Sequence, residues 1–110
     1  MAFDEDLAAR VRDALHAEAG VTGKRMFGGL AFLVNGNMAV SVSGQGGLLL
    51  RVDPSDTELG KRPHAEVAVM RGRELAGWLR IDADGVRTKH QLEQWVGRGV
   101  AYARTLPPKK

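Results

Sequence analysis

The sequence predicts an α+β fold in which one antiparallel sheet carries its helices on one face. Three observations lead to this class. Apolar residues recur at helical spacing near both ends of the chain, short apolar runs between them are separated by turn residues, and neighbouring runs form hairpins. The 110 residues contain no linker, so we expect a single domain over residues 1–110. The expected order is helix, three strands, helix, two strands, helix.

The first helix is expected to begin at the cap residue Asp4 and to end at Gly20. Glu5 and Asp6 occupy its first turn, where negative charge complements the helix dipole. Its apolar stripe consists of Phe3, Leu7, Val11, Ala14, Leu15 and Ala19. This stripe predicts a helix that packs against the sheet.

Three strands are expected next. Asn35-Gly36 is a preferred pair for a two-residue type I′ turn, so it predicts the clearest hairpin of the chain. The pair Gly28-Gly29 interrupts the first strand and indicates a bulge or a close backbone approach. The expected strand segments are Lys24–Phe27 with Leu30–Val34, Met38–Val42, and Leu48–Val52.

A short helix is expected after these strands. Asp53-Pro54 is a helix-start pair, because Asp caps a helix and Pro fits its first position. Glu58 follows Ser55 by three residues and offers a second capping box. The helix is expected to stop near Gly60.

A second hairpin and a last helix complete the predicted fold. The hairpin pairs Ala65–Met70 with Glu74–Ile81 through an Arg-Gly-Arg turn. Thr88 and Gln91 form a capping box that opens the last helix, and a proline pair ends it. Its apolar stripe consists of Leu92, Trp95, Val96, Val100 and Ala103.

Composition excludes several classes of protein. The absence of cysteine excludes disulfide scaffolds, cysteine zinc sites and thiol nucleophiles. Residues 26–50 carry no charge, but six glycines and the Asn35-Gly36 turn favour strands over a membrane helix. Three acids among the first six residues do not fit a secretory signal. We therefore expect a cytoplasmic protein that has no membrane partner.

The charge is distributed unevenly. Residues 1–20 carry five acids and two bases, whereas residues 86–110 carry six bases and one acid. The basic last helix could bind phosphate together with Arg71, Arg73 and Arg80, or its bases could form a solvated face that complements the helix dipole. Aromatic residues, on which single-strand binders stack bases, make up only 5%. We expect weak nucleic-acid binding at most.

No cofactor site and no metal site are expected. Gly23-Lys24 and Gly60-Lys61 are each followed by Arg, where a phosphate loop needs Ser or Thr. The glycine-rich segment 44–47 joins two strands and opens no helix. The chain has three histidines, His16, His64 and His90, and no two of them are spaced as metal ligands are.

Serine hydrolase chemistry is not expected either, since no Gly-x-Ser-x-Gly motif occurs. His64 is expected to have a capping or turn role, with general acid or base as the alternative. The candidate interaction surface combines arginines, aromatic residues and glycines. It consists of Arg25, Phe27, Gly28, Gly29, Arg51, His64, Arg71, Arg73 and Trp78.

Two features suggest self-association. Gly97 and Gly99 indicate close packing of the last helix against another element or against a second subunit. The uncharged stretch from Met26 onward lacks the lysines that usually protect a sheet edge. A homodimer through this edge or through the last helix is expected.

Four motifs follow one another along the chain. They are Arg25-Met26-Phe27-Gly28-Gly29-Leu30-Ala31-Phe32, Leu50-Arg51-Val52-Asp53, Met70-Arg71-Gly72-Arg73 with Gly77-Trp78-Leu79, and Trp95-Val96 with Tyr102-Ala103-Arg104. In this order they resemble the N-terminal domain of TfoX/Sxy-like competence regulators. The resemblance runs from about Asp4 to Pro108 and implies an α+β domain of the secretion-chaperone-like type.

The resemblance implies a regulatory function and no catalytic residues. Full-length relatives resemble bacterial co-activators of competence genes that work with the cyclic-AMP receptor protein, and they carry a second, C-terminal helical domain that we do not expect in this protein. The leading hypothesis is therefore a non-enzymatic interaction domain with a protein partner such as a transcription regulator. Weak nucleic-acid binding is the alternative, and a small-ligand or enzymatic role would rest on His64, Arg25 and Arg51.

Overall fold

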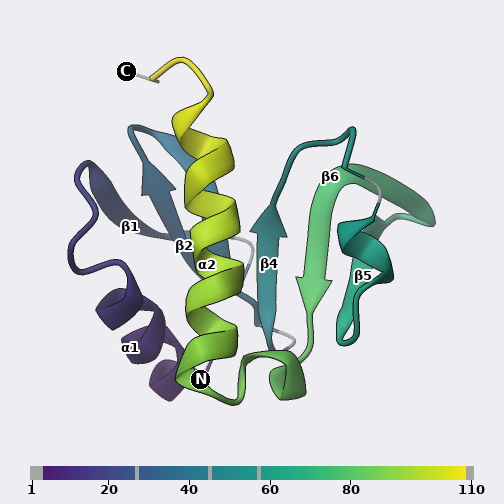
Figure 1. Ribbon diagram of the computed structural model, residues 1–110, viewed down its shortest axis with the longest axis horizontal. Helices are drawn as coiled ribbons and strands as arrows, with labels where there is room; N and C mark the ends of the chain where they lie inside the picture. The colour runs from purple at the N-terminus through teal and green to yellow at the C-terminus, as the bar shows by residue number, and fades with distance from the viewer. Residues whose placement is uncertain (1–3, 27, 45, 57, 109–110) are drawn as a thin grey trace.

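The computed structural model describes residues 4–26, 28–44, 46–56 and 58–108. A six-stranded antiparallel sheet in the order β1-β2-β3-β4-β6-β5 packs against two α-helices that lie side by side (Figure 1). The elements are α1 Glu5–Ala14, β1 Val21–Met26, β2 Gly29–Val34, β3 Asn37–Val42, β4 Leu48–Arg51, the 3-10 turn η1 Leu59–Lys61, β5 Ala65–Met70, β6 Arg73–Ile81, the 3-10 turn η2 Ala83–Val86, and α2 Lys89–Arg104.

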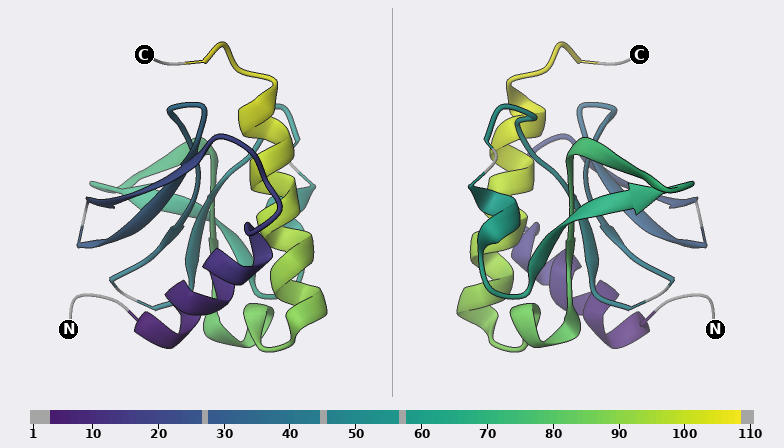
Figure 2. Two further views of the ribbon diagram at one scale, coloured as in Figure 1. Left: turned by 90° about the vertical axis from the view of Figure 1, so that its left-hand side faces the viewer. Right: turned by 90° about the vertical axis from the view of Figure 1, so that its right-hand side faces the viewer.

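The predicted α+β class is confirmed, with a helix first, a helix last and an antiparallel sheet between them. Seen from the side, α2 stands as a layer against the twisted sheet (Figure 2). One hydrophobic core joins the helices to the sheet, and Val11, Val40, Leu50 and Leu92 are among its fully buried members.

The strand count differs from the prediction, because β1 is a strand of its own. Met26 of β1 pairs with Gly29 of β2, so the glycine pair lies at a tight hairpin and is not a bulge within one strand. Gly28 has a φ of +74°, which favours glycine. A Cβ at Gly29 would lie 2.2 Å from the carbonyl oxygen of Val42, so the predicted close backbone approach is present.

The middle helix is reduced to the single 3-10 turn η1. Asp53 does cap a turn, since its carboxylate accepts hydrogen bonds from the Ser55 N–H at 2.9 Å and hydroxyl at 2.8 Å. The turn does not extend into an α-helix, and Glu58, at the N-cap of η1, makes no side-chain cap hydrogen bond. Leu59 is the only buried residue of η1. A short helix needs an apolar face to be stable, and a single buried residue does not supply one.

The caps of the two long helices form as predicted. Asp4 accepts a hydrogen bond from the Leu7 N–H at 3.1 Å, and Thr88 and Gln91 form a complete capping box. The first helix ends at Ala14, earlier than Gly20, because Ala17 and the residues after it are exposed and have no apolar face to bury.

Gly99 is where α2 comes closest to the sheet. A Cβ there would lie 2.5 Å from the carbonyl oxygen of Ala39 and 2.9 Å from Cδ1 of Leu50. The last helix was predicted to pack closely against another element or against a second subunit. At Gly99 it packs against β3 and β4 of the same chain. Gly97 is exposed, and a Cβ there would meet nothing within 4 Å.

The outer strands of the sheet are β1 and β5. β1 carries Lys24 and Arg25, so the expectation of an uncharged edge is wrong for this strand. The uncharged stretch supplies mainly the interior strands β2, β3 and β4. β5 carries the single charge of Glu66, and its Val69 is 59% exposed. Among the described residues, no helix has the length and apolar character needed to cross a membrane.

Candidate functional site

Three residues that are distant in the sequence meet at one place. Arg51 ends β4, Trp78 lies in β6, and Tyr102 lies near the end of α2. The guanidinium carbon of Arg51 is 5.5 Å from the ring centroid of Trp78 and 5.9 Å from that of Tyr102. All three residues are partly buried. These distances are those of cation–π contacts, and we name the group the arginine–aromatic cluster.

An irregularity in β6 brings Trp78 to this position. Residues 75–78 of β6 lie opposite the single Ala68 of β5, so β6 bulges away from β5. The bulge is bonded to the segment after β4, because the Val52 N–H donates to the carbonyl oxygen of Gly77 at 2.8 Å. Gly77 has a φ of +87°, and a Cβ there would lie 3.0 Å from the Val52 carbonyl oxygen. Trp78 is consequently the register partner of Arg51.

Arg51 differs from the arginines that hold the fold together. Arg10 donates to the carbonyl oxygens of Val86 and Arg87, and Arg104 donates to Glu18. Among the described residues, the Arg51 guanidinium has neither a hydrogen-bond partner nor an ion-pair partner. The two rings thus fix the guanidinium while its N–H groups stay available for an anion.

An apolar groove lies beside the cluster. Its cavity volume is about 300 Å³, and Trp78 forms part of its wall. Its uncharged lining comes from β5, β6, η1 and the segment after β4, and consists of Val52, Pro54, Gly60, Val67, Ala76, Gly77, Trp78 and Leu79. The groove also has two exposed acids, Asp56 and Glu74. We name it the Trp78 groove.

Asp53, in the turn beside this groove, remains ionised at neutral pH. Its carboxylate is exposed, and the hydrogen bonds that it accepts from the Ser55 backbone N–H and hydroxyl hold the pKa of Asp53 below its ordinary value of 3.8. The surroundings of the groove therefore carry negative charge, while Arg51 carries positive charge.

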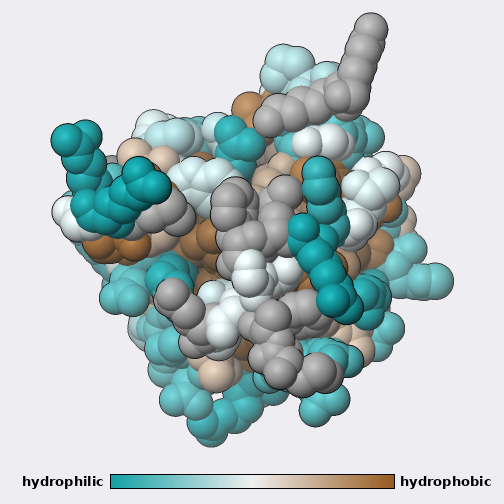
Figure 3. Space-filling view, turned by 180° about the vertical axis from the view of Figure 1, so that it is seen from behind, coloured by the Kyte–Doolittle hydropathy of each residue, from teal (hydrophilic) through white to brown (hydrophobic). Residues whose placement is uncertain are grey.

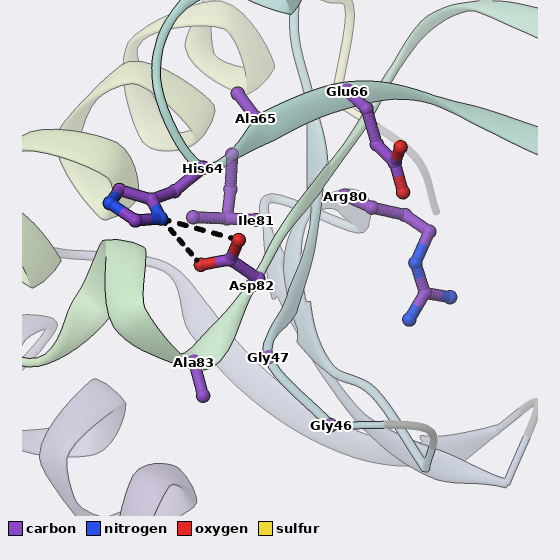
Figure 4. A pocket seen from close by; sticks show the side chains of 9 residues that line it. All are labelled: Gly46, Gly47, His64, Ala65, Glu66, Arg80, Ile81, Asp82 and Ala83. Carbon is purple, nitrogen blue, oxygen red and sulfur yellow. Dashed lines mark hydrogen bonds and ion pairs between the residues drawn. The ribbon is translucent and has the colours of Figure 1, made fainter.

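A second, larger cleft of about 440 Å³ lies where β5 begins and β6 ends (Figure 4). The Nδ1 atom of His64 is 3.1 Å from Oδ1 of Asp82 and 3.3 Å from Oδ2. The Asp82 carboxylate also accepts the Gly85 N–H at 2.9 Å, and the Asp82 N–H donates to the His64 carbonyl oxygen. The pair therefore ties the start of β5 to the end of β6.

The cleft offers few reactive groups. His64 sits in a turn, which agrees with its predicted turn role, and has a φ of +68°. The other lining residues are Gly46, Gly47, Ala65, Glu66, Arg80, Ile81 and Ala83, and they include no hydroxyl or thiol. Figure 4 shows Glu66 and Arg80 on the far side of the strands from the His64–Asp82 pair. Within the described ranges, no group of three His, Cys, Asp or Glu residues is placed to hold a metal ion.

The structure brings together only part of the predicted interaction surface. Arg51 and Trp78 meet. Arg25, Gly28 and Gly29 lie instead in the β1–β2 hairpin, at the opposite edge of the sheet from β5. The exposed residues Arg71 and Arg73 lie at the turn that joins β5 to β6, and His64 lies in the cleft. Phe27 lies outside the described residues. Tyr102 was missed as a member of the site, although its motif was noted.

The bases proposed for nucleic-acid binding do not share one surface. Leu79 and Ile81 lie in the core, so Arg80 between them points to the other face of the sheet. Figure 3 shows this face, where hydrophilic side chains surround hydrophobic patches. On α2, Arg104 is paired with Glu18 at 2.8 Å, and Arg98 lies over the ring of Trp95.

The chain was compared with known proteins. No curated protein and no solved structure matches it. A family model described as the TfoX N-terminal domain matches residues 4–103, which is nearly the whole chain and includes Arg51, Trp78 and Tyr102. The chain therefore belongs to the TfoX N-terminal domain family.

Proposed function

We propose that the chain is a non-enzymatic cytoplasmic domain that binds a protein partner through the arginine–aromatic cluster, in the regulation of transcription. Membership of the TfoX N-terminal domain family supports the regulatory part of this proposal. The observation that carries the binding part is the convergence of Arg51, Trp78 and Tyr102 on one partly buried surface.

The composition of the cluster is that of a binding hot spot. Trp, Tyr and Arg are the residue types that contribute most to binding energy at protein interfaces. The contacts between Arg51 and the two rings restrict all three side chains before a partner arrives. Binding then costs less side-chain entropy, typically about 0.5–1.5 kcal/mol per side chain that would otherwise be immobilised.

The His64–Asp82 pair supports the non-enzymatic part of the proposal. Asp82 caps η2 and contacts His64, while the backbone of His64 bonds to Asp82. Each of these contacts has a structural purpose within the fold. Among the described lining residues of the cleft there is no hydroxyl or thiol that His64 could activate as a nucleophile.

The test is affinity capture from the native host with the tagged full chain, followed by mass spectrometry. Three variants are compared: Trp78→Ala, Arg51→Ala and, as the matched control, Arg98→Ala. Arg98 also lies over an indole, at 5.7 Å, so its removal costs a similar contact away from the cluster. Melting temperatures show that each variant is folded.

We expect a protein that the wild-type chain and Arg98→Ala capture equally, and that Trp78→Ala and Arg51→Ala both lose. Capture that persists in both cluster variants would overturn the proposal. So would capture that all three variants lose to the same extent.

A further inference from the structure

We propose that the Trp78 groove binds a short segment of the partner protein in which an aliphatic side chain stands between an acidic and a basic residue. This inference rests on the proposed function and specifies the chemistry of the partner. It follows from the size and lining of the groove, from the neighbouring Arg51 and from the two acids of the groove.

The aliphatic side chain is indicated by the size and lining of the groove. Its volume of about 300 Å³ is at the small end of ligand sites, so it suits a side chain or two better than a cofactor. Val52, Pro54 and the Trp78 ring line it. A branched aliphatic side chain would bury apolar surface here without leaving a polar atom unpaired.

The acidic residue is indicated by Arg51. Its guanidinium is fixed against Trp78, at 5.5 Å from the ring centroid, and has no hydrogen-bond or ion-pair partner within the described residues. A fixed planar guanidinium matches a carboxylate with two parallel hydrogen bonds. A segment whose aliphatic side chain lies against Trp78 places a neighbouring carboxylate within reach of Arg51.

The basic residue is indicated by the two acids of the groove. Asp56 and Glu74 are both exposed, and neither has an ion-pair partner in the described part of the chain. Asp53, ionised in the neighbouring turn, adds negative charge. These carboxylates would attract a basic side chain of the bound segment and would repel the phosphates of a nucleic acid. The charges therefore favour a peptide over a nucleic acid.

The experiment selects ligands from a displayed library of random nine-residue peptides, using the folded full chain as bait. Selected peptides are synthesised with a fluorescent label, and their affinities are measured by anisotropy for the wild-type chain and for Arg51→Ala, Arg51→Glu, Glu74→Lys and Glu66→Lys. Glu66→Lys is the matched control for Glu74→Lys, because Glu66 lies in β5 at the other cleft. A ten-nucleotide single strand serves as the competing probe.

We expect selected peptides to share an aliphatic residue between an acid and a base. Arg51→Ala should weaken binding about tenfold or more, the effect of losing hydrogen bonds to a charged group. Arg51→Glu should regain affinity when the acid of the peptide is replaced by Lys. Glu74→Lys should weaken binding, and Glu66→Lys should not.

The inference is overturned if no peptide is enriched, if the enriched peptides lack the acid, or if the charge exchange at Arg51 restores nothing. It is also overturned if the oligonucleotide binds more tightly than the peptides and Arg51→Ala abolishes that binding. The proposed function would survive these results if host capture still depends on Arg51 and Trp78, so the two failures are distinguishable.

Discussion

Several single residues in this chain are confined to one conformation by neighbouring backbone or by aromatic rings. Arg51 is an example, because two aromatic rings from different elements lie within cation–π distance of its guanidinium. Gly29 is another, since the Val42 carbonyl oxygen occupies the space that a side chain would need. The motif residues thus include both contact residues and residues that allow close backbone packing.

At Gly28 we predict a stability effect and no effect on nucleotide binding. Its φ of +74° strains any L side chain, so Gly28→Ala should destabilise the fold by about 1–2 kcal/mol. Gly29→Ala should cost more, because its Cβ would meet backbone at 2.2 Å. Thermal melts measure both effects, and calorimetric titration with nucleotides should give no heat. Saturable nucleotide binding that Gly28→Ala removes would contradict this assignment.

At Asp53 we predict a titration change. Ser55→Ala removes the hydroxyl hydrogen bond and should raise the pKa of Asp53 toward 3.8, although the Ser55 N–H still donates. In the wild-type chain the pKa of Asp53 is lower in the folded state than in the unfolded state. The ionised carboxylate therefore stabilises the fold at pH values above its unfolded-state pKa, and this stabilisation is lost as the pH falls through its folded-state pKa. An NMR pH titration of the carboxyl carbon measures the shift. An unchanged pKa in Ser55→Ala would show that the Ser55 hydroxyl does not lower the pKa of Asp53.

At the scale of elements, the close approach at Gly99 determines where α2, which carries Tyr102, lies on the sheet. Gly99→Ala should destabilise the fold by about 1–3 kcal/mol, the usual cost of overpacking, because its Cβ would lie 2.5 Å from the Ala39 carbonyl oxygen. Gly97→Ala is the matched control on the same helix. It should stabilise by up to about 1 kcal/mol, since Ala favours helix and nothing lies within 4 Å. Denaturant melts that rank the two variants in the opposite order would contradict this packing.

The elements that the sequence predicted correctly depend on local chemistry. The capping box of Thr88 and Gln91 and the Asn35-Gly36 turn, with both residues at positive φ, form as expected because neighbouring residues determine them. The middle helix was predicted from equally good cap residues, yet only η1 formed, because a cap does not supply an apolar face. The β1–β2 hairpin was missed because a glycine pair fits both a bulge and a turn.

The arginine–aromatic cluster was only partly predictable for a related reason. Arg51 and Trp78 were singled out as unusual residues in strands, but their contact depends on the bulge at residues 75–78 of β6. Tyr102 joins them because α2 crosses the sheet at one particular place, which Gly99 permits. Register and crossing position are tertiary properties, and no spacing along the chain encodes them.

At the scale of the whole molecule, we predict that any homodimer forms through β5. Gly99 is covered by the sheet and β1 is protected by Lys24 and Arg25, whereas β5 exposes Val69. Sedimentation across a hundredfold concentration range should show the mass rising from 11.9 kDa toward twice that value. Val69→Lys should abolish the rise, and Thr22→Lys on β1 should not. A mass fixed at 11.9 kDa would exclude the dimer.

We also predict weak binding to nucleic acid. The bases are divided between α2 and the opposite face of the sheet, so few can contact one duplex. The logarithm of the affinity should fall with the logarithm of salt with a slope of about −0.9 per phosphate contact, and binding by a few contacts should vanish at physiological salt. Sequence-selective binding that persists at about 200 mM salt would favour the nucleic-acid alternative.

The central claim, that a protein partner binds at the arginine–aromatic cluster, can be tested with the two tryptophans of the chain. Trp78 belongs to the cluster, while Trp95 is only 8% exposed and lies under Arg98. The measurement records both indole N–H signals of the isotope-labelled full chain as the captured partner is added. Our account predicts that the Trp78 signal shifts in proportion to binding and that the Trp95 signal stays in place. A complex that leaves the Trp78 signal unchanged would contradict it.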